Sequence, residues 1–290
     1  MRQAIYPERE GLKSLEKLPQ WTRLPSLCCQ AAGGYPEWVD DLTVAWVLFY
    51  TAADLMDKVQ DQDQPDPWWR DLGSGAALSV ATGVYFSASL VLNELLRNPI
   101  TRPSANEIIR DFYNNLLIMT SGQYRELIER VSTLEDYWEY AGAKSGVFFA
   151  TACRCAARLA IDDQDLLNDF YQFGYHFGLL VQIHDDLDDI QPPTNQAAPG
   201  QKKEIARSLA VIYALSVLPP HDCKRLKWSL SKAPTDSIAA EEVVDILNRS
   251  NAALYLLTEL ERHRKLALDA IMRACKPSPA QETLISYLSI

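Results

Sequence analysis

The sequence predicts an all-α fold, and three observations lead to that prediction. From Pro36 onward, long segments with helical spacing of apolar residues alternate with short breaks rich in Pro, Gly, Asp or Asn. No run shows the alternating pattern that is typical of a strand. Several segments are long enough for helices of about 25 residues, roughly 40 Å in length. Helices of that length favour a bundle around a deep hydrophobic cavity.

The breaks place the predicted helices along the chain. They fall at 62–67, 98–103, 191–200, 219–220 and 277–279. The longest predicted helices are 104–131, 133–160 and 163–190. No break has the composition of an interdomain linker, so we expect one domain over 1–290, with 1–35 as an N-terminal arm and first helix. The break at 191–200 has a mobile composition and follows the most acidic helix end, which predicts a lid.

Composition excludes several classes of protein. With 290 residues and 48% hydrophobic content, the chain can bury one large core, which excludes a disordered or fibrous protein. It has 28 basic and 38 acidic residues and a net charge of -10, so we expect no nucleic-acid partner. An acidic protein that handles an anionic substrate needs bridging cations.

The sequence also predicts a soluble, cytoplasmic protein without a transmembrane segment. The apolar stretch near the first acidic cluster, 42–53, has about 12 residues, fewer than the roughly 20 needed to span a bilayer. The first residues carry charges of both signs and lack the apolar core of a signal peptide. The six cysteines form no C-x-x-C pair and are interpreted as reduced thiols.

The strongest signal for a functional site lies at 178–190, where an apolar helix acquires four carboxylates within five positions. Asp185 and Asp189 are four residues apart and share one helix face, so both can reach one hard cation. Carboxylates at a helix C-terminus oppose the helix dipole, which makes a purely structural role unfavourable. We therefore predict metal ligands at Asp185, Asp186 and Asp189.

A second acidic group ends the helix that precedes the break at 62–67. Asp54, Asp57 and Asp61 follow one another at i, i+3 and i+7 and share one face. If this helix faces the first cluster, they form the opposite wall of a metal site. Asp57 with Asp61 is an alternative i, i+4 pair, and a solvated helix end is the structural alternative for this group.

Together the two clusters resemble the aspartate-rich motifs of the trans-isoprenyl diphosphate synthase superfamily, whose second motif usually reads G-x-x-F-Q-x-x-D-D-x-x-D. The matching residues are Gly178, Gln182, Asp185, Asp186 and Asp189. The resemblance continues through Gly122-Gln123, the segment 143–149 and the segment 208–215, and it covers roughly residues 20 to 220.

The resemblance implies an isoprenoid synthase bundle with two or three Mg²⁺ ions at the mouth of its cavity, an allylic prenyl diphosphate as substrate, and a homodimer. The catalytic residues it implies are Asp54, Asp57, Asp185 and Gln182. The substrate-binding residues it implies are Gln123, Lys144, Lys202, Lys203 and Arg23. From its position alone, Gln182 is equally well interpreted as a buried, hydrogen-bonded polar residue.

Departures from the family pattern bear on the reaction. Ala53 stands where chain-elongating members have the first of two adjacent aspartates, and their paired arginines are absent from the residues that follow. Only Arg23 resembles the basic residues with which the chain-elongating members bind isopentenyl diphosphate. Because a second diphosphate would bind poorly without a cationic clamp, the pattern favours a class I terpene synthase, a lyase that acts on farnesyl or geranylgeranyl diphosphate alone.

Two alternatives remain. One is a chain-elongating or peptide-modifying trans-prenyltransferase that holds its acceptor by other means. The other is a non-catalytic partner subunit, which the altered first motif allows. Retention of both acidic faces argues against that last alternative, because a subunit without catalytic demands has no reason to keep clustered carboxylates at a helix end.

Overall fold

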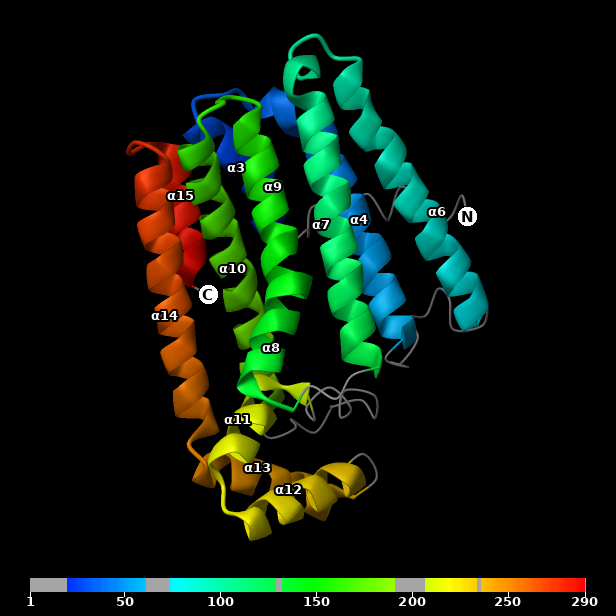
Figure 1. Ribbon diagram of the computed structural model, residues 1–290, viewed down its shortest axis with the longest axis vertical. Helices are drawn as coiled ribbons and strands as arrows, with labels where there is room; N and C mark the ends of the chain where they lie inside the picture. Colours follow the sequence, from blue (N-terminus) through cyan, green and yellow to red (C-terminus); the bar gives the residue numbers. More distant parts are fainter. Residues whose placement is uncertain (1–19, 61–72, 129–131, 191–206, 234–235, 290) are drawn as a thin grey trace.

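A computed structural model of the chain describes residues 20–60, 73–128, 132–190, 207–233 and 236–289, apart from the side chains of residues 126, 189 and 190. Every regular element in these ranges is helical, which confirms the all-α prediction. Figure 1 shows the long helices side by side, with two shorter helices across the lower end of the bundle. The predicted lid at 191–200 and the break at 62–67 lie outside the described residues.

The first half of the chain supplies one side of the bundle. Its elements are η1 (Gln20–Arg23), α3 (Leu24–Ala31), η2 (Pro36–Val39), α4 (Asp40–Gln60), α6 (Ser74–Leu92), η3 (Asn93–Leu96) and α7 (Arg102–Ile128). The break predicted at 98–103 is therefore observed, and helix 104–131 corresponds to α7.

The second half completes the bundle and adds the lower helices. Its elements are α8 (Leu134–Ala141), η4 (Gly142–Gly146), α9 (Val147–Arg158), α10 (Gln164–Ile190), α11 (Leu209–Val217), α12 (Pro220–Lys232), α13 (Ser237–Arg249), α14 (Ala252–Ala274), α15 (Pro279–Ser286) and η6 (Tyr287–Ser289). The predicted helix 133–160 is interrupted, because η4 is a π-helical turn between α8 and α9.

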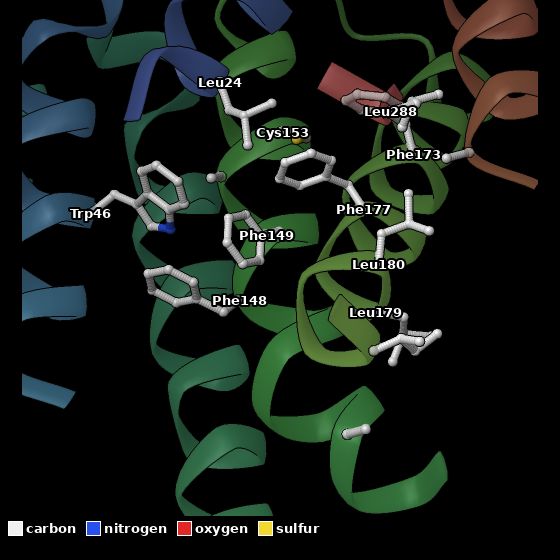
Figure 2. Packing of buried hydrophobic residues seen from close by; sticks show 14 of the residues in the cluster. Leu24, Trp46, Phe148, Phe149, Cys153, Phe173, Phe177, Leu179, Leu180 and Leu288 are labelled. Carbon is white, nitrogen blue, oxygen red and sulfur yellow. The ribbon is translucent and has the colours of Figure 1, made fainter. Parts of the chain in front are cut away.

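Aromatic side chains fill the space between α4 and the central helices. Trp46 of α4 stacks on Phe148 of α9 with ring centroids 5.0 Å apart, and Phe149 meets Phe177 of α10 at 5.2 Å (Figure 2). Toward α7, the gap lined by Trp46, Phe148 and Phe112 leaves no room for a water molecule. This packing buries large apolar area and holds the bundle together.

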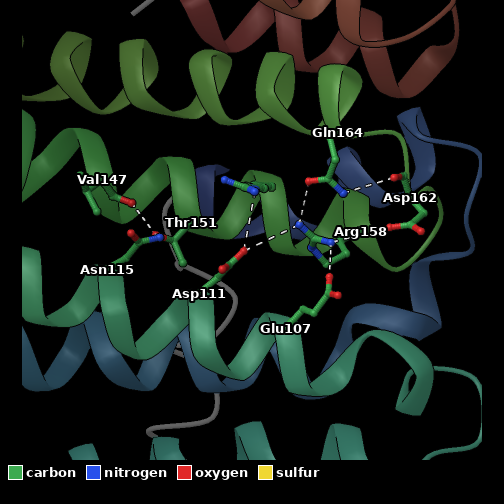
Figure 3. A network of polar contacts seen from close by, with 9 residues as sticks. Glu107, Asp111, Asn115, Val147, Thr151, Arg158, Asp162 and Gln164 are labelled. Carbon is green, nitrogen blue, oxygen red and sulfur yellow. Dashed lines mark hydrogen bonds and ion pairs between the residues drawn. The ribbon is translucent and has the colours of Figure 1, made fainter.

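A buried ion network joins α7 to the far end of α9 (Figure 3). The Arg158 side chain is 5% exposed and pairs with Glu107, while Asp111 lies 3.9 Å from its second terminal nitrogen. One helical turn after Asp111 on α7, Asn115 donates a hydrogen bond of 2.8 Å to Thr151 of α9. A buried guanidinium is tolerated only when carboxylates surround it, so this network fixes the register of the two helices.

Helix α6 and the short η3 that continues it form the outermost layer beside α4 (Figure 1). Among the described helices, Ser74–Leu96 is long and apolar enough to cross a membrane by length and composition. The sequence-based prediction of no transmembrane segment considered only the apolar stretch 42–53. Length and composition do not distinguish a membrane span from a packed helix, and α6 does pack on α4 through the buried Ala77 and Ala81.

Two histidines meet inside the interface between α10 and α14. The Nδ1 atoms of His176 and His263 are 2.9 Å apart, so one imidazole donates and the other accepts. Burial lowers the pKa of His176 to about 4 and that of His263 to about 3. The neighbouring positive charge of Arg262 acts in the same direction. Both rings are therefore neutral in the folded protein at neutral pH.

We predict that the free energy of unfolding falls as the pH is lowered from about 6.5 to about 4. In that window the unfolded chain protonates both imidazoles while the folded protein does not, so acid favours unfolding. Urea unfolding at a series of pH values measures the slope. An imidazole titration by NMR with a midpoint near 6.5 for His263 would contradict the prediction, and His221→Gln, at an exposed histidine, should leave the slope unchanged.

Candidate active site

The two acidic helix ends lie at the same end of the bundle, where α4 and α10 both finish (Figure 1). Asp54 and Asp57 occupy the last two turns of α4, and Asp185 lies near the end of α10. Tyr50 lies between the two groups. Burial and the negative charges of Asp54, Asp185 and Asp57 together raise the pKa of its hydroxyl. Both acidic groups thus lie near Tyr50, and their role as two walls of a metal site stays a prediction.

Lys144 bridges these walls. Its ammonium nitrogen lies 3.0 Å from both carboxylate oxygens of Asp57, and its charge also acts on Asp185. Gln123 supports the same carboxylate, donating hydrogen bonds of 2.7 Å to Asp57 and 3.1 Å to Gln60. Asp57 is therefore held from two sides by residues of α7 and of the π-helical turn.

Asp185 carries an unfavourable charge in this position. Burial raises its pKa above the ordinary range for Asp, and the negative charge of Asp188 adds to this effect. The charges of His184 and Lys144 act in the opposite direction but do not cancel it. A carboxylate in such surroundings is stabilised by any further cation that binds beside it.

Asp186 makes structural contacts. It is 5% exposed, and its Oδ2 accepts a hydrogen bond of 2.6 Å from the Tyr137 hydroxyl and one of 2.8 Å from the backbone N–H of Leu209. These contacts tie α10 to α8 and to the start of α11. The metal role expected for Asp186 stays a prediction, and its carboxylate has a packing role independent of any metal.

Gln182 lies one turn before Asp185 and is oriented by Ser145. The Ser145 hydroxyl donates to the Gln182 Oε1 at 2.8 Å, so the amide nitrogen of Gln182 remains as a donor. This contact is consistent with either role considered for Gln182, because the hydrogen bond both satisfies the side chain and fixes its direction.

The other expected site residues are placed differently. Arg23 is exposed at the end of η1, and no hydrogen bond or ion pair within the described residues links it to the acidic ends. Asp61, Lys202, Lys203 and the side chain of Asp189 lie outside the described residues.

Glycines on facing helices let the backbone of the π-helical turn approach α10. A Cβ on Gly178 would collide with the carbonyl of Ser145, and one on Gly146 would lie 2.7 Å from the Tyr175 ring. The wider π turn projects Lys144 and Ser145 toward the acidic ends. Close helix approach therefore sets the positions of two polar site residues.

The donor set suits a hard divalent cation, which the fold class leads one to expect. Asp54, Asp57 and Asp185 supply carboxylate oxygens, the ligands that Mg²⁺ and Ca²⁺ prefer. Asp54 is paired with Lys58 at 3.0 Å, and Asp57 with Lys144. Within the described residues, no three acidic, His or Cys side chains are already clustered as a metal site. The chemistry of these residues fits the ion, provided that it replaces the lysines as their counter-charge.

A family model named polyprenyl synthetase matches residues 24–247. The chain belongs to the polyprenyl synthetase family. The matched range runs from α3 to α13 and contains both acidic helix ends, Lys144 and the π-helical turn.

Curated relatives carry names of the same kind. A "Short chain isoprenyl diphosphate synthase" of Methanothermobacter thermautotrophicus is 24% identical over 270 residues, 90% of this chain and 81% of that protein. A "Prenyl transferase" of Synechocystis sp. is 33% identical over 92 residues, 31% of this chain and only 26% of that protein.

Solved structures of this family share the fold. The geranylgeranyl pyrophosphate synthetase of Pyrococcus horikoshii Ot3 has a TM-score of 0.82 at 20% identity, covering 93% of this chain and 84% of that one. A polyprenyl synthase of Caulobacter crescentus CB15, complexed with calcium and isoprenyl diphosphate, has a TM-score of 0.79 at 17% identity, covering 92% and 82%.

The preference for a lyase over a transferase is wrong. The relatives of this polyprenyl synthetase family member are named as prenyl transferases and isoprenyl diphosphate synthases, all of them transferases. The expectation gave too much weight to Ala53 and to the missing arginines. In the structure, Asp54 and Asp57 lie in the last turns of α4, at the same end of the bundle as Asp185, so the change at Ala53 does not remove the carboxylates beside it.

Sequence reasoning missed three contacts of the site. The pairing of Lys144 with Asp57 joins positions 87 residues apart, and the Tyr137–Asp186 bond joins positions 49 apart. Gln60 was not considered, although it lies one turn after Asp57 on the same acidic face. That spacing was the one local signal that could have identified it.

We predict that Gly178→Ala lowers the free energy of unfolding by about 1–3 kcal/mol, because the added methyl must displace the backbone at Ser145. Urea unfolding monitored by circular dichroism measures the change. Gly75→Ala is the matched control: its Cβ meets nothing within 4 Å, and the change favours a helix. Equal stability of wild type and Gly178→Ala would contradict the close approach of η4 to α10.

Proposed function

We propose that this polyprenyl synthetase family member is a magnesium-dependent trans-prenyltransferase that acts on an allylic prenyl diphosphate. One observation carries the proposal: Lys144 pairs with Asp57 of α4, and its charge also acts on Asp185 of α10, at one end of a bundle packed with aromatic rings. The names of the relatives support the reaction class. The substrate is part of the proposal, because the chain matches only 26% of the length of the Synechocystis relative.

The residues suggest how the reaction begins. The carbon–oxygen bond of the allylic diphosphate breaks, and the diphosphate leaves with the bonding electrons. Lys144 contributes fixed positive charge toward the leaving group. Tyr50, an exposed ring near both acidic helix ends, would stabilise the prenyl cation through its π-face, as aromatic rings do for other cations. The acceptor's electrons then form the new bond, and a proton is lost.

Magnesium is the proposed cofactor, with two or three ions expected. Asp54, Asp57 and Asp185 would hold it, and when bound it neutralises the charge of the leaving diphosphate. The calcium and isoprenyl diphosphate named for the Caulobacter crescentus structure support a divalent cation and this substrate class. In this arrangement Lys144 gives up Asp57 and becomes available to the diphosphate.

Isopentenyl diphosphate is the first candidate acceptor, because the relatives are named isoprenyl diphosphate synthases. The chain lacks the paired arginines that follow the first motif in elongating members, so its grip on a second diphosphate differs from theirs. A peptide acceptor is the second candidate, since a peptide carries no diphosphate that requires this clamp.

We predict that the purified protein, given Mg²⁺, converts geranyl or farnesyl diphosphate to a longer diphosphate only when isopentenyl diphosphate is added. Chromatography of dephosphorylated extracts measures the product. Asp57→Asn should reduce turnover by at least about 100-fold, because it removes charge that the cation needs. Asp165→Asn, at the far end of α10, is the matched control and should keep full activity.

Other outcomes would overturn parts of this proposal. A hydrocarbon or alcohol from one diphosphate alone would contradict the transferase. Prenylation of a peptide without elongation would replace isopentenyl diphosphate as acceptor. Absence of any product, with Mg²⁺ and all substrates present, would favour a non-catalytic partner subunit.

We also propose that the protein is a homodimer joined through α6 and α7. The α6 helix exposes Phe86 and Leu90 at 65% and 71%, and α7 exposes Leu117 at 69%. The α6 sequence from 74 to 92 contains no charged residue, so water is a poor environment for its outer face. A second copy of the same chain would cover this face symmetrically.

We predict a dimer mass by analytical ultracentrifugation, and we predict that Leu90→Glu converts it to monomer by burying a carboxylate at the contact. Leu254→Glu, which places the same charge at a similarly exposed leucine of α14, should remain dimeric. A monomeric wild type at micromolar concentration would contradict the interface.

A further inference from the structure

Helix α12 carries a basic outer face in a protein whose charge is otherwise acidic. Between Pro220 and Lys232 the sequence has four Lys or Arg residues and one Asp, whereas the whole chain has a net charge of -10. The inner side of the helix is fixed by the buried Leu226 and Ser229. The positive charges are therefore concentrated on the side that faces solvent.

The exposed residues form a continuous strip. Lys224, Trp228 and Lys232 follow one another at i, i+4 and i+8, and Lys227 lies beside them. All four are exposed, and Trp228 is 57% exposed, which is unusual for a residue with so large an apolar surface. An indole among ammonium groups is typical of segments that lie at a membrane–water boundary.

Among the described residues, no ion pair joins the acidic residues of α13 to Lys224 or Lys227 of this strip. Glu242 of α13 contacts Ser229 and Arg225, so its charge is directed at the inner edge of α12. Arg225 is the one basic residue of α12 that this contact engages. The ammonium groups of Lys224 and Lys227 remain on the outer face.

The position of α12 determines which part of the protein a surface bound to the strip would face. Figure 1 shows α12 and α13 across the lower end of the molecule, beyond the point where α4 and α10 finish. A helix of 13 residues is about 20 Å long and can lie flat on a surface. A surface bound to α12 would therefore face the end of the bundle that carries Asp57 and Asp185.

We propose that α12 docks the protein onto an anionic lipid surface. Lysines on a polar face attract anionic headgroups, and a tryptophan between them inserts at the headgroup level. The overall negative charge makes this attraction directional, because the α12 side carries positive charge whereas the chain as a whole is negative. The proposal concerns the surface alone and stands independently of the reaction proposed above.

The test is sedimentation of the full chain with vesicles of phosphatidylcholine containing 30% phosphatidylserine, in low salt. We expect binding to these vesicles, none to pure phosphatidylcholine, and weakening as salt is raised. Replacing Lys224 and Lys227 by Gln should weaken binding about 25-fold, at about fivefold for each lysine. Trp228→Gln should weaken binding at every salt concentration.

The control variant removes the same charge elsewhere. Arg110 and Lys265 are exposed residues outside α12, and replacing both by Gln should leave vesicle binding intact. Equal losses in the two double variants would overturn the proposal, as would wild-type binding that ignores phosphatidylserine. Release from the vesicles by millimolar inorganic diphosphate would also overturn it, because the strip would then be a site for a soluble anion.

Discussion

Carboxylates at the C-terminal ends of two helices impose the constraint on which the rest of the structure depends. Asp57 lies in the last turn of α4 and Asp185 in the last two turns of α10, toward the ends where the helix dipole places negative charge. Without compensation these ends would repel one another and weaken both helices. Lys144 supplies the compensation at Asp57, and its charge also reaches Asp185. The protein thus keeps a charged site at one end of the bundle at the cost of local stability, which packing elsewhere must offset.

The position of the Lys144 side chain depends on the backbone geometry of η4. A regular α-helix through 133–160 would not place Lys144 and Ser145 as the π turn does. The turn is possible because Gly178 lets α10 approach its backbone, and because Gly146 leaves space for the Tyr175 ring. Charge compensation in the site therefore rests on apolar and steric contacts between η4 and α10. A change in that contact would move the ammonium group away from both acidic walls.

The helices and the acidic clusters could be predicted from the sequence, because helical periodicity and the spacing of carboxylates are local signals. The fold class, α7, α10 and the breaks near 98–103 and 219–220 follow from them. The π turn could not be predicted, since a glycine inside a helical pattern signals lower stability rather than an inserted residue. Partners far apart in the sequence, such as Tyr137 for Asp186, depend on the packing of whole helices. The reaction class was misjudged from Ala53, because one position of a motif says little about an acceptor bound elsewhere.

The two ends of the bundle are stabilised in different ways, and this difference bears on how a prenyl chain enters. At the far end, Arg158 is hydrogen-bonded to Glu107, and Asp111 lies 3.9 Å from the guanidinium. Nearer the acidic end, rings such as Trp46 and Phe148 fill the space between α4, α7 and α9 without such contacts. Within the part of the chain that the structure describes, the buried indole N–H of Trp46 has no hydrogen-bond partner, which costs about 1–3 kcal/mol. A hydrocarbon chain would exchange ring–ring contacts for ring–chain contacts of similar strength. On the proposed function, a prenyl chain that enters from the acidic end would displace these rings without breaking the Arg158 network.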